Sequence, residues 1–176
     1  LGGKVNPKLR VYASQLQLDW GVECHRLTRP EEYADAGLRA KAAGYSAIKV
    51  NPMIFDRHGN VFARYTGLLD ADRIKMAAER VEATRLAIGN DMDIMLELHA
   101  NTDIGSATQV CRALEEYNIF VAGEAVSPLS ADNLLALTRQ TSIPQAGGER
   151  IYGRWVFRPY VENQSMRLAQ PDLGNC

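Results

Sequence analysis

The chain has 176 residues with a formal net charge of −1, and 46% of its residues are hydrophobic. It is long enough for one domain with a sizeable core, and its near-neutral charge gives no reason to expect a nucleic-acid partner. The apolar runs are too short to span a bilayer and no secretory signal is visible, so we expect no membrane partner. Three cysteines without a CxxC motif are typical of reduced thiols, which predicts a cytoplasmic protein.

In the first part of the chain, a strand pattern precedes a helix pattern. Residues 9–14 ("LRVYAS") predict a first strand. Thr28 and Glu31 have the spacing of a capping box with a proline in the first turn, which predicts a helix start. Residues 45–50 ("YSAIKV") then predict a buried strand.

The middle of the chain repeats this alternation. Asp70 or Asp72 opens a predicted helix that ends at Gly89. Residues 93–98 ("DIMLEL") predict the next strand. Ser106 has a capping-box spacing with the glutamine three residues later, and the apolar residues that follow predict an amphipathic helix.

The last part continues in the same order. Residues 118–124 ("NIFVAGE") predict a strand, and Ser130 begins a predicted helix. Residues 143–149 ("IPQAGGE") predict another strand. A short helix over 153–163 and a strand over 166–172 ("MRLAQPD") complete the predicted elements.

Six strands alternate with about five helices in this prediction. The strands are apolar without polar alternation, which is typical of parallel strands covered on both faces. This order predicts an α/β protein that is either a doubly wound sheet or a (β/α)8-type TIM barrel. No GxGxxG motif follows the first strand, so a Rossmann dinucleotide site is unsupported. A full barrel needs roughly 250 residues, so this chain would supply about six of eight β/α units.

Both ends of the chain look like cuts in a longer sequence. The chain starts with "LGGKV" rather than with Met, and it stops at "QPDLGNC" directly after a predicted strand. We therefore expect one partial barrel domain over residues 1–176.

Polar side chains follow the predicted strands one after another. They are Lys49, Glu97, His99, Glu124, Glu149 and Asp172. Barrel enzymes build their active sites at this rim. Carboxylates that converge there repel unless a cation lies among them, and hard oxygen ligands favour Mg²⁺ over zinc. His99 lies two residues after Glu97, so we expect it on the same side of its strand, where it could donate a proton.

These residues also have an ordinary structural explanation. A single glutamate at a strand end is usually a solvated loop residue. A single lysine there usually extends its charged end into solvent. The pattern alone therefore leaves both a metal site and a solvated rim open.

Six motifs occur in the same order as in a known family. They are "LGGKV", "GYSAIKVNP", "DIMLELHANTD", "YNIFVAGEAVSP", "IPQAGGERIYGRW" and "QPDLGNC". Together they resemble the enolase superfamily, and in particular the mandelate racemase-like branch that contains galactonate dehydratase and other acid-sugar dehydratases. The resemblance implies a modified (β/α)8 barrel, whose N-terminal capping domain and last strands would lie outside this chain.

The resemblance also implies a site. In the family, acidic residues on strands three to five hold Mg²⁺, which stabilises the enediolate formed when a base removes the α-proton. Glu97 matches the ligand of strand three and Glu149 that of strand five. His99 matches the histidine that dehydratases use as general acid to expel the β-hydroxyl. Lys49 occupies the strand-two position of a basic residue, and Asp172 matches the aspartate that orients a catalytic histidine on the next strand.

Strand four departs from the family pattern. Relatives have Glu-Glu-Pro or Glu-Gln-Pro there, with the first Glu as ligand, whereas this chain has Gly123-Glu124-Ala125. The separations 97 to 123 and 123 to 149 are both 26 residues, which supports this register. Because side chains alternate along a strand, Glu124 should point away from the site unless the strand bulges, in which case it could be a substitute ligand.

Three further residues follow the strand-five ligand. Arg150, Tyr152 and Arg154 are predicted to bind substrate, and Arg150 could also orient a metal-binding carboxylate.

We therefore predict a Mg²⁺-dependent dehydratase of a small-molecule sugar acid, homo-oligomeric like its relatives. Two alternatives remain open. A racemase, epimerase or cycloisomerase of the same superfamily would use Lys49 as one of two bases. A non-catalytic fragment or pseudoenzyme is favoured by Gly123.

Overall fold

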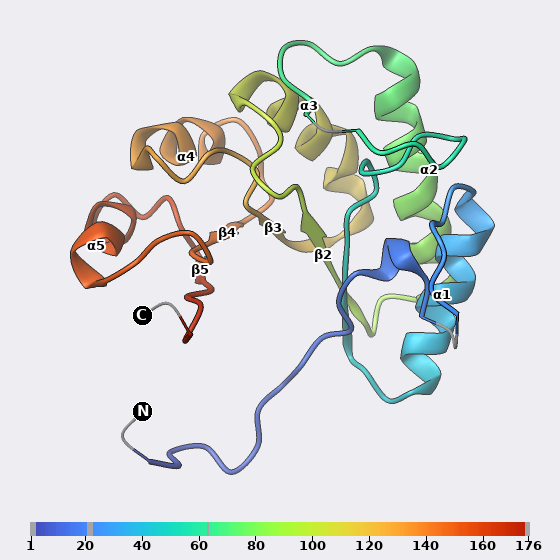
Figure 1. Ribbon diagram of the computed structural model, residues 1–176, viewed down its shortest axis with the longest axis horizontal. Coiled ribbons are helices and arrows are strands. Elements are labelled where there is room, and N and C mark those ends of the chain that lie inside the picture. Colours follow the sequence, from blue (N-terminus) through green and yellow to red (C-terminus); the bar gives the residue numbers. More distant parts are fainter. Residues whose placement is uncertain (1–2, 21–22, 63, 175–176) are drawn as a thin grey trace.

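The structure is a computed structural model that describes residues 3–20, 23–62 and 64–174. Its centre is a sheet of five parallel strands, ordered β1-β2-β3-β4-β5 as in the chain (Figure 1). The strands are β1 Ala47–Val50, β2 Asp93–Glu97, β3 Ile119–Gly123, β4 Gln145–Gly147 and β5 Leu168–Ala169. A sheet in which each strand pairs with the next along the chain is the arrangement of a barrel wall, so the expected α/β barrel segment is confirmed.

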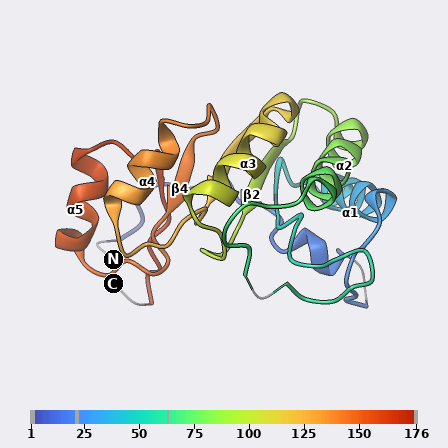
Figure 2. The same ribbon diagram turned by 90° about the horizontal axis from the view of Figure 1, so that it is seen from above.

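Helices connect the strands and lie along one side of the sheet. They are α1 Pro30–Ala42, α2 Ala71–Ile88, α3 Ile104–Leu114, α4 Ala131–Thr138 and α5 Arg154–Glu162, with short 3-10 turns at Leu16–Leu18 and Glu115–Tyr117. Figure 2 shows the five helices following one another along this side. Within the described residues, no helix is long and apolar enough to cross a membrane.

The core is divided between the two faces of the sheet. Ile48, Ile94 and Leu96 belong to the large cluster that packs against the helices. Met95, in the same strand, belongs instead to a small cluster with Val121 and Ala146 on the other face. Burial on both faces explains why these strands read as continuous apolar runs. Cys24 is exposed and Cys111 is buried, both as free thiols, and Cys176 lies outside the described residues.

The strand predicted over residues 9–14 is not formed, so the prediction of six strands is wrong for the described residues. Only Ala13 pairs with the sheet, donating to the carbonyl of Ala47 (2.9 Å) and accepting from the amide of Lys49 (2.7 Å). Gln15 then adopts a left-handed conformation with φ 58° and leads into the first 3-10 turn. The segment therefore lies beside β1 without extending the ladder.

Two helix starts also differ from the prediction. The carboxylate that accepts from the amides of Thr28 and Arg29 belongs to Glu32, not Glu31. Helix α3 begins at Ile104, earlier than predicted, because its N-cap is Asp103 and not Ser106. The Asp103 carboxylate accepts from the amide of Ser106 and from that of Gly67 in the loop after β1. Asp70 and Ser130 cap α2 and α4 as predicted.

A fully buried arginine fastens the loop after β1 to the helices. The Arg80 side chain donates to the carbonyls of Pro52 (2.8 Å), Phe55 (2.7 Å) and Thr28 (2.7 Å). Its guanidinium also lies over the ring of Tyr33, 5.2 Å from the centroid. A buried charge is costly unless its donors are satisfied, and here backbone carbonyls satisfy them.

We predict that Arg80→Leu lowers the free energy of unfolding by about 3 kcal/mol or more, because several buried carbonyls lose their donor at once. Chemical denaturation measures the change. Lys75→Ala, on the exposed face of the same helix, is the control and should stay within about 0.5 kcal/mol. An equal effect of the two changes would contradict a clamping role for Arg80.

Candidate active site

Four of the predicted site residues line one cavity at the carboxyl ends of the strands. The cavity has a volume of about 200 Å³. Its lining is Tyr12, Lys49, Glu97, Glu124, Gly147, Glu149, Gln170 and Pro171. Because parallel strands end at the same edge, residues that are far apart in the chain meet here.

Lys49 and Glu97 form a buried ion pair across β1 and β2. Lys49 Nζ lies 2.9 Å from Glu97 Oε2, and the two side chains are only 11% and 5% exposed. Burial acts to lower the pKa of Lys49, but the charge and hydrogen bond of Glu97 outweigh it, so the pKa is raised above its ordinary value. Lys49 is therefore a cation in this arrangement.

Glu124 turns into the cavity, although strand alternation predicts that it points away. β3 ends at Gly123, and Glu124 follows with a left-handed φ of 40° while its amide still donates to Ala146 (3.0 Å). The backbone thus stays in the ladder while the side-chain direction changes. Among the described residues, Glu124 Oε1 is one of four buried side-chain polar atoms with no hydrogen-bond partner.

The charge of Glu124 is strongly influenced by its surroundings. Burial, together with the nearby charges of Glu149 and Glu97, raises the pKa of its carboxyl to about 7, against the opposing effect of the Arg150 charge. Arg150 forms an ion pair with the other oxygen, Oε2. The three carboxylates are therefore close enough to repel one another.

Gly123 lies at the end of β3, directly beside the carboxylate of Glu97. A Cβ at this position would lie 2.9 Å from Glu97 Oε2 and 3.2 Å from the carbonyl of Leu96. A side chain at residue 123 would therefore start beside the Glu97 carboxylate, in agreement with the sequence register.

Arg150 connects the remaining acidic residues. Besides Glu124, its guanidinium contacts Glu149 Oε1 at 3.4 Å and donates to the carbonyl of His99 at 3.2 Å. The predicted charge-assisted contact between Arg150 and a cavity carboxylate is thus present, and its role toward substrate stays a prediction.

His99 lies at the rim, but not for the reason inferred from the sequence. β2 ends at Glu97, and His99 and Ala100 both have positive φ, 53° and 54°, so strand alternation does not extend to His99. Its amide donates to Glu97 Oε1 (3.2 Å), while its ring Nδ1 lies 3.0 Å from Asn51 Nδ2. Among the described residues, the lining of the carboxylate cavity does not include His99.

Three other predicted residues lie outside the cavity. Tyr152 is about half exposed. Arg154 lies over the ring of Trp155, 4.9 Å from the centroid. Asp172 is exposed and accepts from the amide of Gly174 (2.8 Å). Their functional roles stay predictions.

Sequence reasoning missed Tyr12 and Gln170 as cavity residues. Tyr12 lies within the predicted first strand, and Lys49 Nζ is 5.1 Å from its ring centroid. Gln170 directly follows β5. The signal for Gln170 is its position directly after a strand, which holds for uncharged as well as charged residues.

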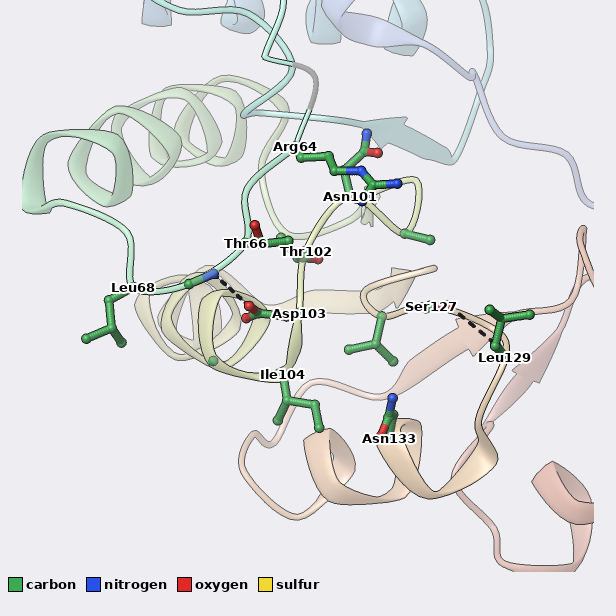
Figure 3. Close-up of a pocket in the computed structure, with 14 residues that line it drawn as sticks. Arg64, Thr66, Leu68, Asn101, Thr102, Asp103, Ile104, Ser127, Leu129 and Asn133 are labelled. Carbon is green, nitrogen blue, oxygen red and sulfur yellow. Dashed lines mark hydrogen bonds between the residues drawn. The ribbon is translucent and has the colours of Figure 1, made fainter.

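A larger cavity, of about 690 Å³, lies over the loops that follow β1, β2 and β3 (Figure 3). Its lining includes Arg64, Asp103, Ser127 and Asn133, with the start of α3 beside it. None of the predicted site residues belongs to this lining, so the chemistry-bearing residues define the smaller cavity.

The donor set of the smaller cavity fits a hard divalent cation in kind. Glu97, Glu124 and Glu149 supply carboxylate oxygens, and the partnerless Glu124 Oε1 is buried among like charges. In their present arrangement, however, the described residues contain no group of three or more His, Cys, Asp or Glu side chains that could hold a metal. Instead, Lys49 forms an ion pair with Glu97, and Arg150 contacts both Glu124 and Glu149.

The parallel sheet, its outer helices and a polar cavity at the strand ends define a member of the β/α-barrel class. More specifically, the profile of the enolase C-terminal domain-like family matches residues 32–176, and the chain belongs to this family. The resemblance to the enolase superfamily is thereby confirmed. Dehydratases of this superfamily generally use Mg²⁺.

Several known proteins are similar to the chain. D-gluconate/D-galactonate dehydratase of Picrophilus torridus is 30% identical over 99% of this chain and 41% of its own length. The crystal structure of a proposed dehydratase from Zymomonas mobilis ZM4 is 47% identical, with a TM-score of 0.95 over 99% of this chain and 45% of that one. An enolase-superfamily member from Salmonella Typhimurium is 44% identical, with a TM-score of 0.96 over 99% of this chain and 45% of that one. The chain thus spans about two fifths of the length of the curated relative that it matches.

We predict that stability depends on pH through Glu124. An unfolded glutamate has a pKa near 4.5, whereas burial raises that of Glu124 to about 7. Between these values the folded chain keeps a proton that the unfolded chain has lost, so the free energy of unfolding falls as pH rises from 4.5 to 7.

Denaturant unfolding at pH 5 and pH 8 tests this dependence. In Glu124→Gln, the free energy of unfolding should decrease less between pH 5 and pH 8 than in the unchanged chain. The control Glu116→Gln, at an exposed position, should show the full decrease. The same pH dependence in Glu124→Gln and in the unchanged chain would contradict the elevated pKa.

Proposed function

We propose that the chain is the central part of the catalytic domain of an acid-sugar dehydratase, a hydro-lyase that converts aldonic acids to 2-keto-3-deoxy acids. The observation that carries this proposal is the convergence of Lys49, Glu97, Glu124 and Glu149 in one cavity at the strand ends. The names of the relatives, which include gluconate, galactonate and xylonate dehydratases, support the same substrate class.

The residues of this chain have distinct proposed roles. Lys49, a buried cation, would bind and neutralise the negative charge that develops on the substrate carboxylate when a base, the histidine that Asp172 would position, takes the α-proton. His99 would donate a proton to the departing β-hydroxyl, which leaves as water. Arg150 would orient Glu124 and Glu149 through the contacts already described.

Glu97, Glu124 and Glu149 would hold Mg²⁺ at this site. When bound, the ion would act as a Lewis acid toward the substrate carboxylate and stabilise the enediolate. Glu124 would then substitute for the ligand that Gly123 lacks. Asp172 would position a histidine on the following strand, while Tyr152 and Arg154 would contact substrate only after a rearrangement of their exposed side chains.

The charge state of Lys49 bears on the racemase, epimerase or cycloisomerase alternative. That alternative needs Lys49 to accept a proton as one of two bases. Its ion pair with Glu97 raises the pKa and favours the protonated form. This observation supports dehydration over a two-base reaction.

One observation favours a non-catalytic alternative. Gly123 supplies no carboxylate, and Lys49 and Arg150 neutralise the carboxylates that remain. A pseudoenzyme would keep the barrel and the ion pairs without turnover. The same experiments on activity and metal binding separate this alternative from the dehydratase.

We also propose that the protein works in the cytoplasm as a homo-oligomer with a sugar acid as its small-molecule partner. The support for this proposal is the similarity to the dehydratases, together with the free thiols of Cys24 and Cys111 among the described residues. Light scattering of the purified protein would decide the oligomeric state.

We predict that the chain, completed with the flanking segments of its Zymomonas relative, forms a keto acid from at least one member of an aldonate panel. Glu97→Gln should lower the rate roughly a hundredfold or more, because it removes a charge that acts on the reacting carboxylate. Glu116→Gln, an exposed glutamate outside the cavity, is the matched control. If neither the completed chain nor its Gly123→Glu variant forms a keto acid from any aldonate of the panel, the dehydratase proposal is wrong. Deuterium exchange at the α-carbon without loss of water would favour the racemase alternative.

Calorimetric titration tests the proposed metal site directly. We expect Mg²⁺ to bind the chain weakly and to bind Gly123→Glu at least about tenfold more tightly, since affinity rises with ligand charge and number. The new side chain would displace the flexible end of Glu97, whose Oε2 lies 2.9 Å from the added Cβ. No binding by either protein, or binding that survives Glu97→Gln, would contradict this metal site.

A further inference from the structure

Asn51 is a polar residue that is completely buried at the end of β1. It follows Val50 directly and has no exposed surface. Its side-chain Nδ2 lies 3.0 Å from Nδ1 of His99, on the neighbouring strand end. A buried amide at this distance from an imidazole restricts which ring nitrogen carries the proton.

The orientation of the Asn51 amide is determined by a second contact. Its Oδ1 accepts a hydrogen bond from the amide of Met53 at 3.0 Å. Reversing the side-chain amide would place its NH₂ group against this N–H donor, so Nδ2 must be the atom that faces His99. An amide nitrogen only donates, and His99 Nδ1 must therefore be the acceptor.

The backbone around Asn51 is held from both sides. Its own N–H donates to Oε1 of the buried Gln17 at 3.1 Å. The carbonyl of the next residue, Pro52, accepts from Arg80 at 2.8 Å. Asn51 therefore cannot easily turn away from His99, and both of its polar side-chain atoms are occupied.

His99 is fixed as firmly through its main chain. Its N–H donates to Glu97 Oε1 at 3.2 Å, and its carbonyl accepts from Arg150 at 3.2 Å. These two contacts hold the main chain of His99 between Glu97 and Arg150, and the side chain of Asn51 contacts its ring. The main chain sets the position of His99, and Asn51 sets the chemistry of its ring.

We propose that Asn51 is a positioning residue that holds neutral His99 in the tautomer with its proton on Nε2. The consequence, which rests on the proposed function, is that Nε2–H is the ring group that donates a hydrogen bond to the oxygen of the departing hydroxyl. A hydrogen bond to one ring nitrogen commonly determines the state of the other in this way. Asn51 itself touches no reacting atom in this role.

Nitrogen NMR of the imidazole rings tests the tautomer without any turnover. The chain has three histidines, so long-range proton–nitrogen correlations at a pH where the rings are neutral give three sets of signals, and His99→Gln identifies the set of His99. We expect an unprotonated Nδ1 and a protonated Nε2. Asn51→Asp, nearly isosteric, presents a carboxylate that accepts from Nδ1–H and should move the proton to Nδ1. Asn51→Ala should give a mixture of the two tautomers.

Asn133→Asp is the control, because it adds the same charge at an exposed position of α4 and should leave the His99 signals unchanged. A protonated Nδ1 in the unchanged chain would overturn the proposal, and so would an unaltered signal pattern in Asn51→Asp. If Asn51→Ala does not fold, the near-isosteric variant still decides the question.

Kinetics separate this proposal from the proposed function. In a protein that dehydrates aldonates, Asn51→Asp should lower kcat roughly tenfold or more with little change in KM, while Asn133→Asp should match the unchanged protein. A proton moved to Nδ1 with an unchanged kcat would overturn the positioning role. Absence of turnover in every protein, together with the expected spectra, would remove the proposed function and leave the tautomer assignment supported.

Discussion

The buried ion pair between Lys49 and Glu97 allows the sheet to end in charged side chains. Neither side chain could stay charged and this deeply buried without the other, because removing an unpaired charge from water costs several kcal/mol of free energy, on the order of the Born penalty after relaxation. Lys49 lies on β1 and Glu97 on β2, so their pairing also links two adjacent strands at the rim. The remaining acidic residues follow the same rule, with Arg150 contacting both Glu124 and Glu149. The pairing of each buried carboxylate with a cation is therefore the constraint from which the arrangement of the cavity follows.

Left-handed backbone conformations at the strand ends also determine where the side chains point. His99, Ala100 and Glu124 all have positive φ although none is a glycine, and they lie within three residues after the ends of β2 and β3. Such conformations are disfavoured by sterics and tend to occur where function requires a particular side-chain direction. Here they turn Glu124 into the cavity and bring the ring of His99 toward Asn51. The consequence is a polar cluster that simple alternation along the strands would not produce.

The cavity combines three carboxylates, Glu97, Glu124 and Glu149, with the cations of Lys49 and Arg150 beside them. Because residue 123 is a glycine, β3 places no side chain in the space beside Glu97 Oε2. Lys49 Nζ contacts that same oxygen. The balance between an internal ammonium and a divalent cation at Glu97 is therefore the chemical question that distinguishes an active dehydratase from a pseudoenzyme on this fold.

The sequence by itself determined three features: the order of strands and helices, the parallel arrangement of the strands, and the position of the carboxylates at the strand ends. Apolar runs, strand-end charges such as Glu97 and the helix caps at Asp70 and Ser130 are local signals, so they are readable without a structure. Tertiary structure decided which residues meet. The inward turn of Glu124 depends on one backbone dihedral angle after β3, and the Asn51–His99 contact joins residues 48 positions apart. Tyr12 reaches the cavity from a segment that pairs through a single residue rather than as a strand. Side-chain direction beyond a strand end is determined by dihedral angles and distant partners, and short-range periodicity carries no information about either.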